Sequence, residues 1–372
     1  MKSWLSGTLF TVFLYGVASA MPLCNYHSPQ TELSDLKIQF SYHYVNNPYG
    51  LQDWDVDAGE LKLSYDRLSE SPDVGFDIVA KSDMTISLVG LSTFLATIEG
   101  NIKRYLSPDA PYFGFAGGSA ESASDYERIG ISSKLGIGYG RFRDVTPLAK
   151  AVRINNQLLE RGSLSEHMND VDLETLAYEI DSLSLYDSLG DLLDVLKEVI
   201  EGSGYVKPGG LDALDIYEIA QIVEDDQLTR YCGGDARLSL GYEIIDPQGD
   251  PNDLLAEAAF NYAFTTTPQE QFLARGSFSS LTGAFELLRA HKIELRLSYD
   301  YALNKLITFL AAYDFERERW EDVPTDRHNL SLTVQVTPIE SAMVTLDMAF
   351  GHEPYFLEWS ADITLGLSVD LL

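Results

Sequence analysis

The end of the chain alternates strictly between apolar and polar side chains over residues 357–372. The apolar positions are Trp359, Ala361, Ile363, Leu365, Leu367, Val369 and Leu371. Successive side chains of a β-strand point to opposite faces, so this stretch predicts one strand with an apolar face and a polar face. Strands of soluble proteins usually run about five or six residues. A strand this long, with charge on its polar face, is typical of a membrane barrel with lipid outside and water inside.

The same stretch resembles the assembly signal of outer-membrane β-barrel proteins. In that signal a polar residue is followed by a Gly and then by apolar residues at alternating positions, which here are Thr364, Gly366, Val369 and Leu371. Such proteins usually end on an aromatic residue, whereas this chain ends on Leu372. The resemblance implies that the chain contacts the barrel-assembly machinery and outer-membrane lipid. The alternative is a long edge strand of a soluble sandwich.

The beginning of the chain has the pattern of a secretory signal peptide. Lys2 supplies a positive charge, residues 5–17 are mostly apolar, and Ala18-Ser19-Ala20 forms an A-x-A ending. We therefore expect residues 1–20 to be removed and the protein to leave the cytoplasm. No later stretch offers the roughly 18 consecutive apolar residues of a spanning helix, so membrane insertion would use strands.

Charge and aromatic content narrow the function classes. The chain has 57 acidic and 26 basic residues, for a formal net charge of −31. Nucleic-acid binding needs clustered Lys and Arg to neutralise phosphates, so this composition excludes that class. The 21 Tyr and 17 Phe suit a transmembrane barrel, which places aromatic girdles at both membrane interfaces.

Changes of periodicity divide the chain. We expect a periplasmic leader over 21–35, barrel strands over 36–143, a helical insert over 144–232 and further strands over 233–372. Six alternating runs precede the insert and eight follow it, which predicts a transmembrane antiparallel barrel of about fourteen strands. Within the first six, one run is expected over 74–81 and the next over 84–105, with Gly90 as a candidate break in the second. If the amino terminus starts in the periplasm, connections after even-numbered runs lie there, so the insert, which follows the sixth run, is periplasmic. The connections expected outside are longer than the inner ones, as in outer-membrane barrels.

The polar positions of these runs carry charges of both signs on the face expected to line the lumen. They are Lys37, Glu60, Lys62, Asp66, Arg237, Glu243, Lys292, Glu294, Arg296 and Asp300. Two interpretations follow. The charges line a water-filled pore and set its selectivity, or they cross-link the interior and close it. The sequence leaves both open, because pore radius depends on strand number and shear.

Enzyme chemistry is not expected. The chain has no G-x-S-x-G motif, and His328 and Ser331 on one strand would point to opposite faces, which cannot form a catalytic pair unaided. The acidic loop Asp246–Asp253 is the best candidate for a weak Ca²⁺ site, although a plain acidic turn is the favoured interpretation. Cys24 and Cys232 are the only cysteines, and secretion favours a bridge between them. The alternative is two free thiols.

Over most of its mature length the chain resembles porin-like outer-membrane barrels, which implies passive diffusion of small solutes or ions across the cell outer membrane. The helical insert is not part of an ordinary porin. It suggests a plug for the channel or a docking surface for a periplasmic partner. The alternative function is a structural or docking barrel with no open pore, which anchors a periplasmic or envelope complex.

Overall fold

The structure, a computed structural model, describes residues 23–28, 31–45, 56–87, 90–108, 110–225, 229–249, 253–281, 290–304, 306–320, 323–339, 342–352 and 359–369. The expected signal peptide, part of the leader, residues 250–252 of the acidic loop and Leu371 lie outside these ranges. The chain divides into two compact units. One holds residues 145–229 together with 1–27 and 265–268, and the other holds the remaining residues.

The larger unit is one antiparallel sheet in which each strand pairs with the next along the chain, from β1 to β14. The prediction of about fourteen antiparallel strands is confirmed. The strands are β1 (Thr31–Val45), β2 (Val56–Glu70), β3 (Val74–Ser87), β4 (Gly90–Tyr105), β5 (Tyr112–Ala123), β6 (Gly130–Asp144), β7 (Tyr231–Ile245), β8 (Leu254–Phe264), β9 (Glu270–Leu281), β10 (His291–Asn304), β11 (Ile307–Trp320), β12 (Val323–Ile339), β13 (Ala342–His352) and β14 (Ser360–Val369).

The register carries the alternation from strand to strand, so apolar side chains meet on one face of the sheet. Leu135 of β6 pairs with Leu240 of β7, and Ile137 pairs with Leu238. Their side chains stay exposed, at 70% for Leu135 and 69% for Leu240. A large exposed apolar face is unusual on a soluble monomer and marks a surface of protein–protein or membrane contact. We call this the outer face, and the opposite one the inner face.

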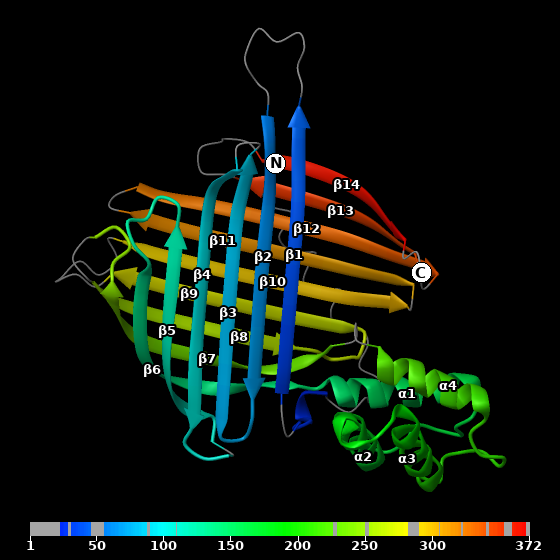
Figure 1. The fold of residues 1–372 in the computed structure, drawn as a ribbon. Coiled ribbons are helices and arrows are strands. Elements are labelled where there is room, and N and C mark those ends of the chain that lie inside the picture. Colours follow the sequence, from blue (N-terminus) through cyan, green and yellow to red (C-terminus); the bar gives the residue numbers. More distant parts are fainter. Residues whose placement is uncertain are drawn as a thin grey trace, which may run out of the picture. The chain divides into compact units, whose positions relative to one another are not determined.

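The sheet bends back so that the inner faces of early and late strands meet. In Figure 1, β1 to β6 pass in front of the strands that follow β6. Ion pairs cross the space between them: Arg275 of β9 reaches Asp66 of β2 at 2.7 Å, and Lys103 of β4 reaches Asp235 of β7 at 2.6 Å. Contacts between strands so far apart in the sheet order require a curled sheet.

Two strand boundaries differ from the sequence-based expectation. β1 begins at Thr31, inside the stretch expected to be leader, because its register with β2 continues to the pair Thr31 and Glu70. β3 continues to Ser87 and does not end at Lys81, and β4 begins at Gly90, the candidate break within the 84–105 run, and not at Met84. In both cases ladder pairing with a neighbour extends the strand beyond its alternating apolar pattern.

The smaller unit contains four helices, α1 (Thr146–Arg161), α2 (Asp170–Asp181), α3 (Leu189–Gly202) and α4 (Ala213–Glu224), and a short turn of 3-10 helix, η3 (Leu183–Leu185). A further 3-10 turn, η2 (Leu23–Asn25), precedes β1. Leu192, Leu196 and Ile200 recur at helical spacing on α3 and are fully buried. No helix among the described residues is long and apolar enough to cross a membrane.

Side-chain caps define where these helices begin. Asn169 accepts from the Asp172 N–H before α2, and Ser188 accepts from the Asp191 N–H before α3. Before α4, Asp212 and Asp215 form a reciprocal capping box. Each cap satisfies backbone donors that the first helical turn leaves without an internal partner.

Asp215 also holds α1 to α4. Its buried carboxylate accepts from the Arg161 guanidinium at 2.7 Å and from the Ser163 hydroxyl at 2.9 Å. Burial alone would raise the pKa of Asp215, but hydrogen bonds from the Asp212 N–H, Ser163 and Arg161 outweigh it, and the pKa lies below its usual range.

This lowered pKa predicts acid sensitivity of the helical unit. Asp215 stabilises the folded unit above its unfolded pKa of about 3.9, and the stabilisation is lost as pH falls through the lower folded value. We expect Asp215→Asn to cost about 2 kcal/mol at pH 7 and much less at pH 3, because it removes charged hydrogen bonds. Thermal unfolding followed by circular dichroism at 222 nm measures this. Asp194→Asn, at an exposed position of α3, is the control. Equal losses at both pH values would contradict the assignment.

Candidate functional site

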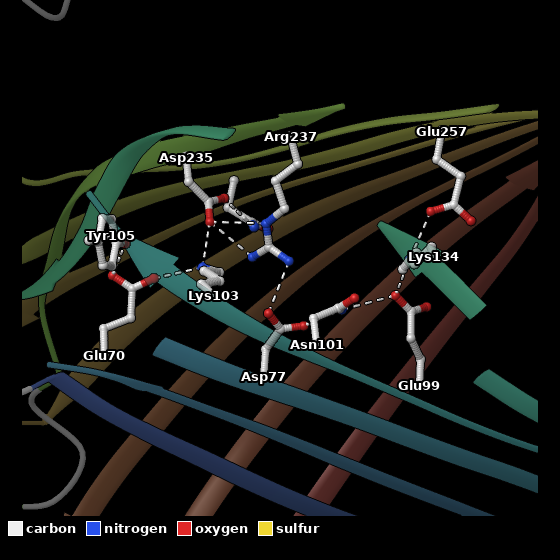
Figure 2. A network of polar contacts seen from close by, with 11 residues as sticks. Glu70, Asp77, Glu99, Asn101, Lys103, Tyr105, Lys134, Asp235, Arg237 and Glu257 are labelled. Carbon is white, nitrogen blue, oxygen red and sulfur yellow. Dashed lines mark hydrogen bonds and ion pairs between the residues drawn. The ribbon is translucent and has the colours of Figure 1, made fainter. Parts of the chain in front are cut away.

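A buried network of charges occupies the inner face of the sheet, with side chains from β2, β3, β4, β6, β7 and β8 (Figure 2). At its centre is Lys103, whose side chain is fully buried. Its ammonium group donates to Glu70 and to Asp235, each at 2.6 Å. The Tyr105 hydroxyl donates to the second oxygen of Glu70 at 3.1 Å. Lys103 thus links the end of β2 to the beginning of β7.

Arg237 extends this network along β7. Its Nη2 donates to Asp235 at 2.9 Å and its Nη1 donates to Asp77 of β3 at 3.0 Å. Asn101 of β4 donates to the second oxygen of Asp77 at 2.7 Å. Asp235 therefore accepts from two cations, and its other oxygen accepts from Asn261 of β8 at 2.8 Å.

Lys134 of β6 adds a second centre. Its ammonium group donates to Glu99 of β4 at 2.6 Å and to Glu257 of β8 at 2.8 Å. Asn101 joins the two centres by donating to Glu99 at 3.2 Å. Each of the three cations, Lys103, Lys134 and Arg237, contacts two carboxylates. A charge removed from water is tolerated only where partners replace its hydration, and this network supplies them.

Aromatic side chains fill the inner face beside the network. Tyr105, Phe113 and Phe115 form one buried cluster, and the rings of Tyr105 and Phe113 lie edge to face at 5.3 Å. The Phe113 and Phe115 rings lie directly on Gly138 and Gly136 of β6, where a Cβ atom would collide with them. Glycine at these two positions is therefore required by the close approach of the rings.

Arg141 of β6 bonds to two turns beside the aromatic cluster. Its guanidinium stacks on the Tyr105 ring at 3.6 Å. It donates to the carbonyls of Pro72 and Ala110, at 2.8 and 3.2 Å. These carbonyls belong to the β2–β3 and β4–β5 connections, so the turns, the aromatic cluster and the network form one packed block.

The inner face of β10 to β12 is different, because its ion pairs remain exposed to solvent. Lys292 contacts Glu294 at 2.8 Å and Glu316 at 3.6 Å, and Arg296 contacts Asp314 at 3.4 Å. The Arg296 side chain is 65% exposed, whereas that of Lys103 is fully buried. The inner face is therefore driest around Lys103 and wet along β10 to β12, while Glu99, at 44% exposed, is intermediate.

The residues predicted to line the lumen divide between these regions. Arg237 belongs to the buried network, and Asp66 pairs with Arg275. The wet inner face of β10 carries Lys292, Glu294 and Arg296, while Asp300 lies 3.6 Å from Arg230. The remaining members belong to neither region. Glu60 pairs with Lys62, and Glu243 accepts from the Asp253 N–H. The Lys37 side chain lies outside the described residues. Their role in a lumen stays a prediction.

Most of the buried network was missed by sequence reasoning. The missed members are Glu70, Asp77, Glu99, Asn101, Lys103, Tyr105, Lys134, Asp235, Asn261 and Glu257. One signal was present. Asp235 lies two residues before Arg237 on the same strand face, and Lys103 occupies a polar position of its own alternating run. No sequence signal shows that they meet.

Three other predicted sites stay predictions. Neither Cys24 nor Cys232 is free, as the predicted bridge requires, and the bridge itself stays a prediction. Thr364, Gly366 and Val369 lie on β14, but their role as an assembly signal stays a prediction. Among the described residues no group of three or more His, Cys, Asp or Glu side chains is placed to hold a metal ion. The calcium site at Asp246–Asp253 also stays a prediction.

A cluster of rings lies near one end of β11 to β14. His328 contacts Phe315 at 5.0 Å, His352 at 6.0 Å and Trp359 at 5.9 Å between ring centroids. The Nδ1 atom of His328 lies 2.8 Å from the Tyr313 hydroxyl. In the register Tyr313, Phe315, His328 and His352 share the outer face. Aromatic rings gathered near strand ends are a feature of transmembrane barrels.

No protein-family model and no curated protein matches the sequence. Among solved structures, the TodX monoaromatic hydrocarbon channel deltaS2 mutant is similar at 9% identity, covering 89% of this chain and 86% of that one, with a TM-score of 0.31. The CymD monoaromatic hydrocarbon channel is similar at 11% identity, covering 93% and 90%, with a TM-score of 0.28. At TM-scores this low the likeness carries no argument about this chain.

Proposed function

We propose that this protein is an outer-membrane β-barrel, closed between β1 and β14, that forms a channel for small solutes or ions. The exposed apolar outer face would contact lipid. Its strands satisfy one another's backbone groups, and closure would satisfy the edges, as the hydrocarbon region requires.

The contrast between the two sides of the inner face carries this proposal. Around Lys103 the charged side chains of Asp235, Arg237 and Asp77 are at most 12% exposed. Arg296 and Asp314 on β10 and β11 are 65% and 45% exposed although they form an ion pair. Water in contact with a charged inner face is what a conducting path needs. The path would run along the wet face of β10 to β13, beside the packed block.

A second candidate function is a docking barrel without an open pore. The buried network favours it, because it cross-links early and late strands and so closes part of the interior. The helical unit would then be the docking surface. Residues 145–229 carry 18 acidic and five basic side chains, which suits a basic partner in the periplasm. The same unit could instead plug a channel.

Neighbouring residues on β11 provide a matched test. In the register, Ala312 pairs with Ser331 on the inner face and Ala311 pairs with Leu332 on the outer face. We expect the purified protein to open steadily in planar bilayers. Ala312→Trp should lower the single-channel conductance because it narrows the path, while Ala311→Trp should leave it unchanged because its ring faces lipid.

If correctly folded protein gave no current in planar bilayers, the channel proposal would be wrong and the docking barrel would be favoured. Equal loss of conductance in both variants would show that the proposed path is misplaced.

A further inference from the structure

We infer that the channel selects cations, so that its substrates are small positively charged solutes. This inference rests on the proposed function and adds the class of solute. It is carried by the imbalance of charge along the wet inner face.

One ammonium group on that face is surrounded by carboxylates. Lys292 contacts Glu294 and Glu316, and it lies opposite Glu318 in the β10–β11 register. Glu316 also lies 3.7 Å from Arg327 of β12. Lys292 and Arg327 together supply two positive charges against the three carboxylates, and the Glu318 side chain is exposed. A negative surplus therefore faces solvent near this end of β10 and β11.

Another carboxylate lies further along the same face. Asp347 of β13 pairs with Thr333 of β12 in the register and accepts from the Thr333 hydroxyl at 2.6 Å. A hydroxyl donor holds the carboxylate in place but does not cancel its charge. The path thus passes a fixed negative charge at Asp347 after it passes Glu318.

The buried network offers no positive charge to offset this surplus. Lys103, Lys134 and Arg237 each contact two carboxylates and are removed from solvent. Paired charges in a dry block contribute little to the field in an adjoining aqueous path, whereas half-exposed charges on its wall lie within a Debye length of about 8–10 Å. Such walls raise the local concentration of counter-ions and repel co-ions.

Reversal potentials in a KCl gradient across a planar bilayer test the inference. We expect the wild-type channel to prefer K⁺ over Cl⁻. Glu318→Gln and Asp347→Asn should each lower the K⁺ to Cl⁻ permeability ratio by about twofold at 0.1 M salt, and the effect should shrink at 1 M salt because of screening. Asn329→Asp adds a carboxylate to the inner face of β12 and should raise the ratio by about as much.

Each result has a separate meaning. Conductance with a preference for Cl⁻, or a ratio that none of the three variants moves, would overturn cation selection and leave the channel intact. If folded protein gave no current in planar bilayers, the proposed channel function would be wrong, and the proposed cation selectivity with it.

Discussion

Replacement of Lys103 by Met is expected to lower the free energy of unfolding by about 3–5 kcal/mol. The side chain is fully buried and holds Glu70 and Asp235 together across the inner face. Met fills a similar volume, so the loss comes from carboxylates that are left in a dry site with fewer partners. Urea unfolding of protein folded in lipid vesicles, followed by tryptophan fluorescence, gives the free energy.

Lys62 provides the matched control for this variant. It also pairs with a carboxylate, Glu60 at 3.2 Å, but both side chains are more than half exposed. Exposed pairs contribute about 0–1 kcal/mol, so Lys62→Met should have little effect. Adding Glu70→Gln to Lys103→Met should recover part of the loss, because one of the unpaired charges disappears. Equal losses at Lys62 and Lys103 would contradict the buried network.

The sequence predicted the sheet better than the site because the two depend on different information. Alternation is local, and each run such as residues 292–301 reports its own two faces. Counting these runs was enough for the number of strands and for the position of the helices. Strand ends were less predictable. Thr31 joins β1 through pairing with Glu70, which no local pattern reports.

The buried network depends on contacts that alternation does not report. Lys103 and Asp235 are 132 residues apart in the chain, and they meet because of how the sheet bends. Bending depends on shear and on side-chain size, including the glycines beneath Phe113 and Phe115. Sequence reasoning therefore left open whether inner charges line a pore or cross-link the interior. The structure shows buried cross-links on β2 to β8 and exposed pairs on β10 to β12.

Replacement of Leu297 by Arg is expected to lower the free energy of unfolding in lipid by about 2–4 kcal/mol. Leu297 lies in the middle of β10, and the register places it between Ala274 of β9 and Tyr313 of β11 on the outer face. A guanidinium at that depth must lose its hydration or distort the bilayer around it. Folding titrations with urea in vesicles measure the cost.

The neighbouring residue separates the effect of the membrane from the effect of an altered strand. Arg296 lies on the inner face, where its side chain is 65% exposed beside Asp314. Arg296→Gln removes a charge one residue away, and an exposed ion pair contributes about 0–1 kcal/mol. In detergent micelles, which adapt to a charged side chain more readily than a bilayer does, the cost of Leu297→Arg should fall while that of Arg296→Gln stays small. If both variants lost the same free energy of unfolding in vesicles, the outer face would not contact lipid, and the proposal of a membrane barrel would be wrong.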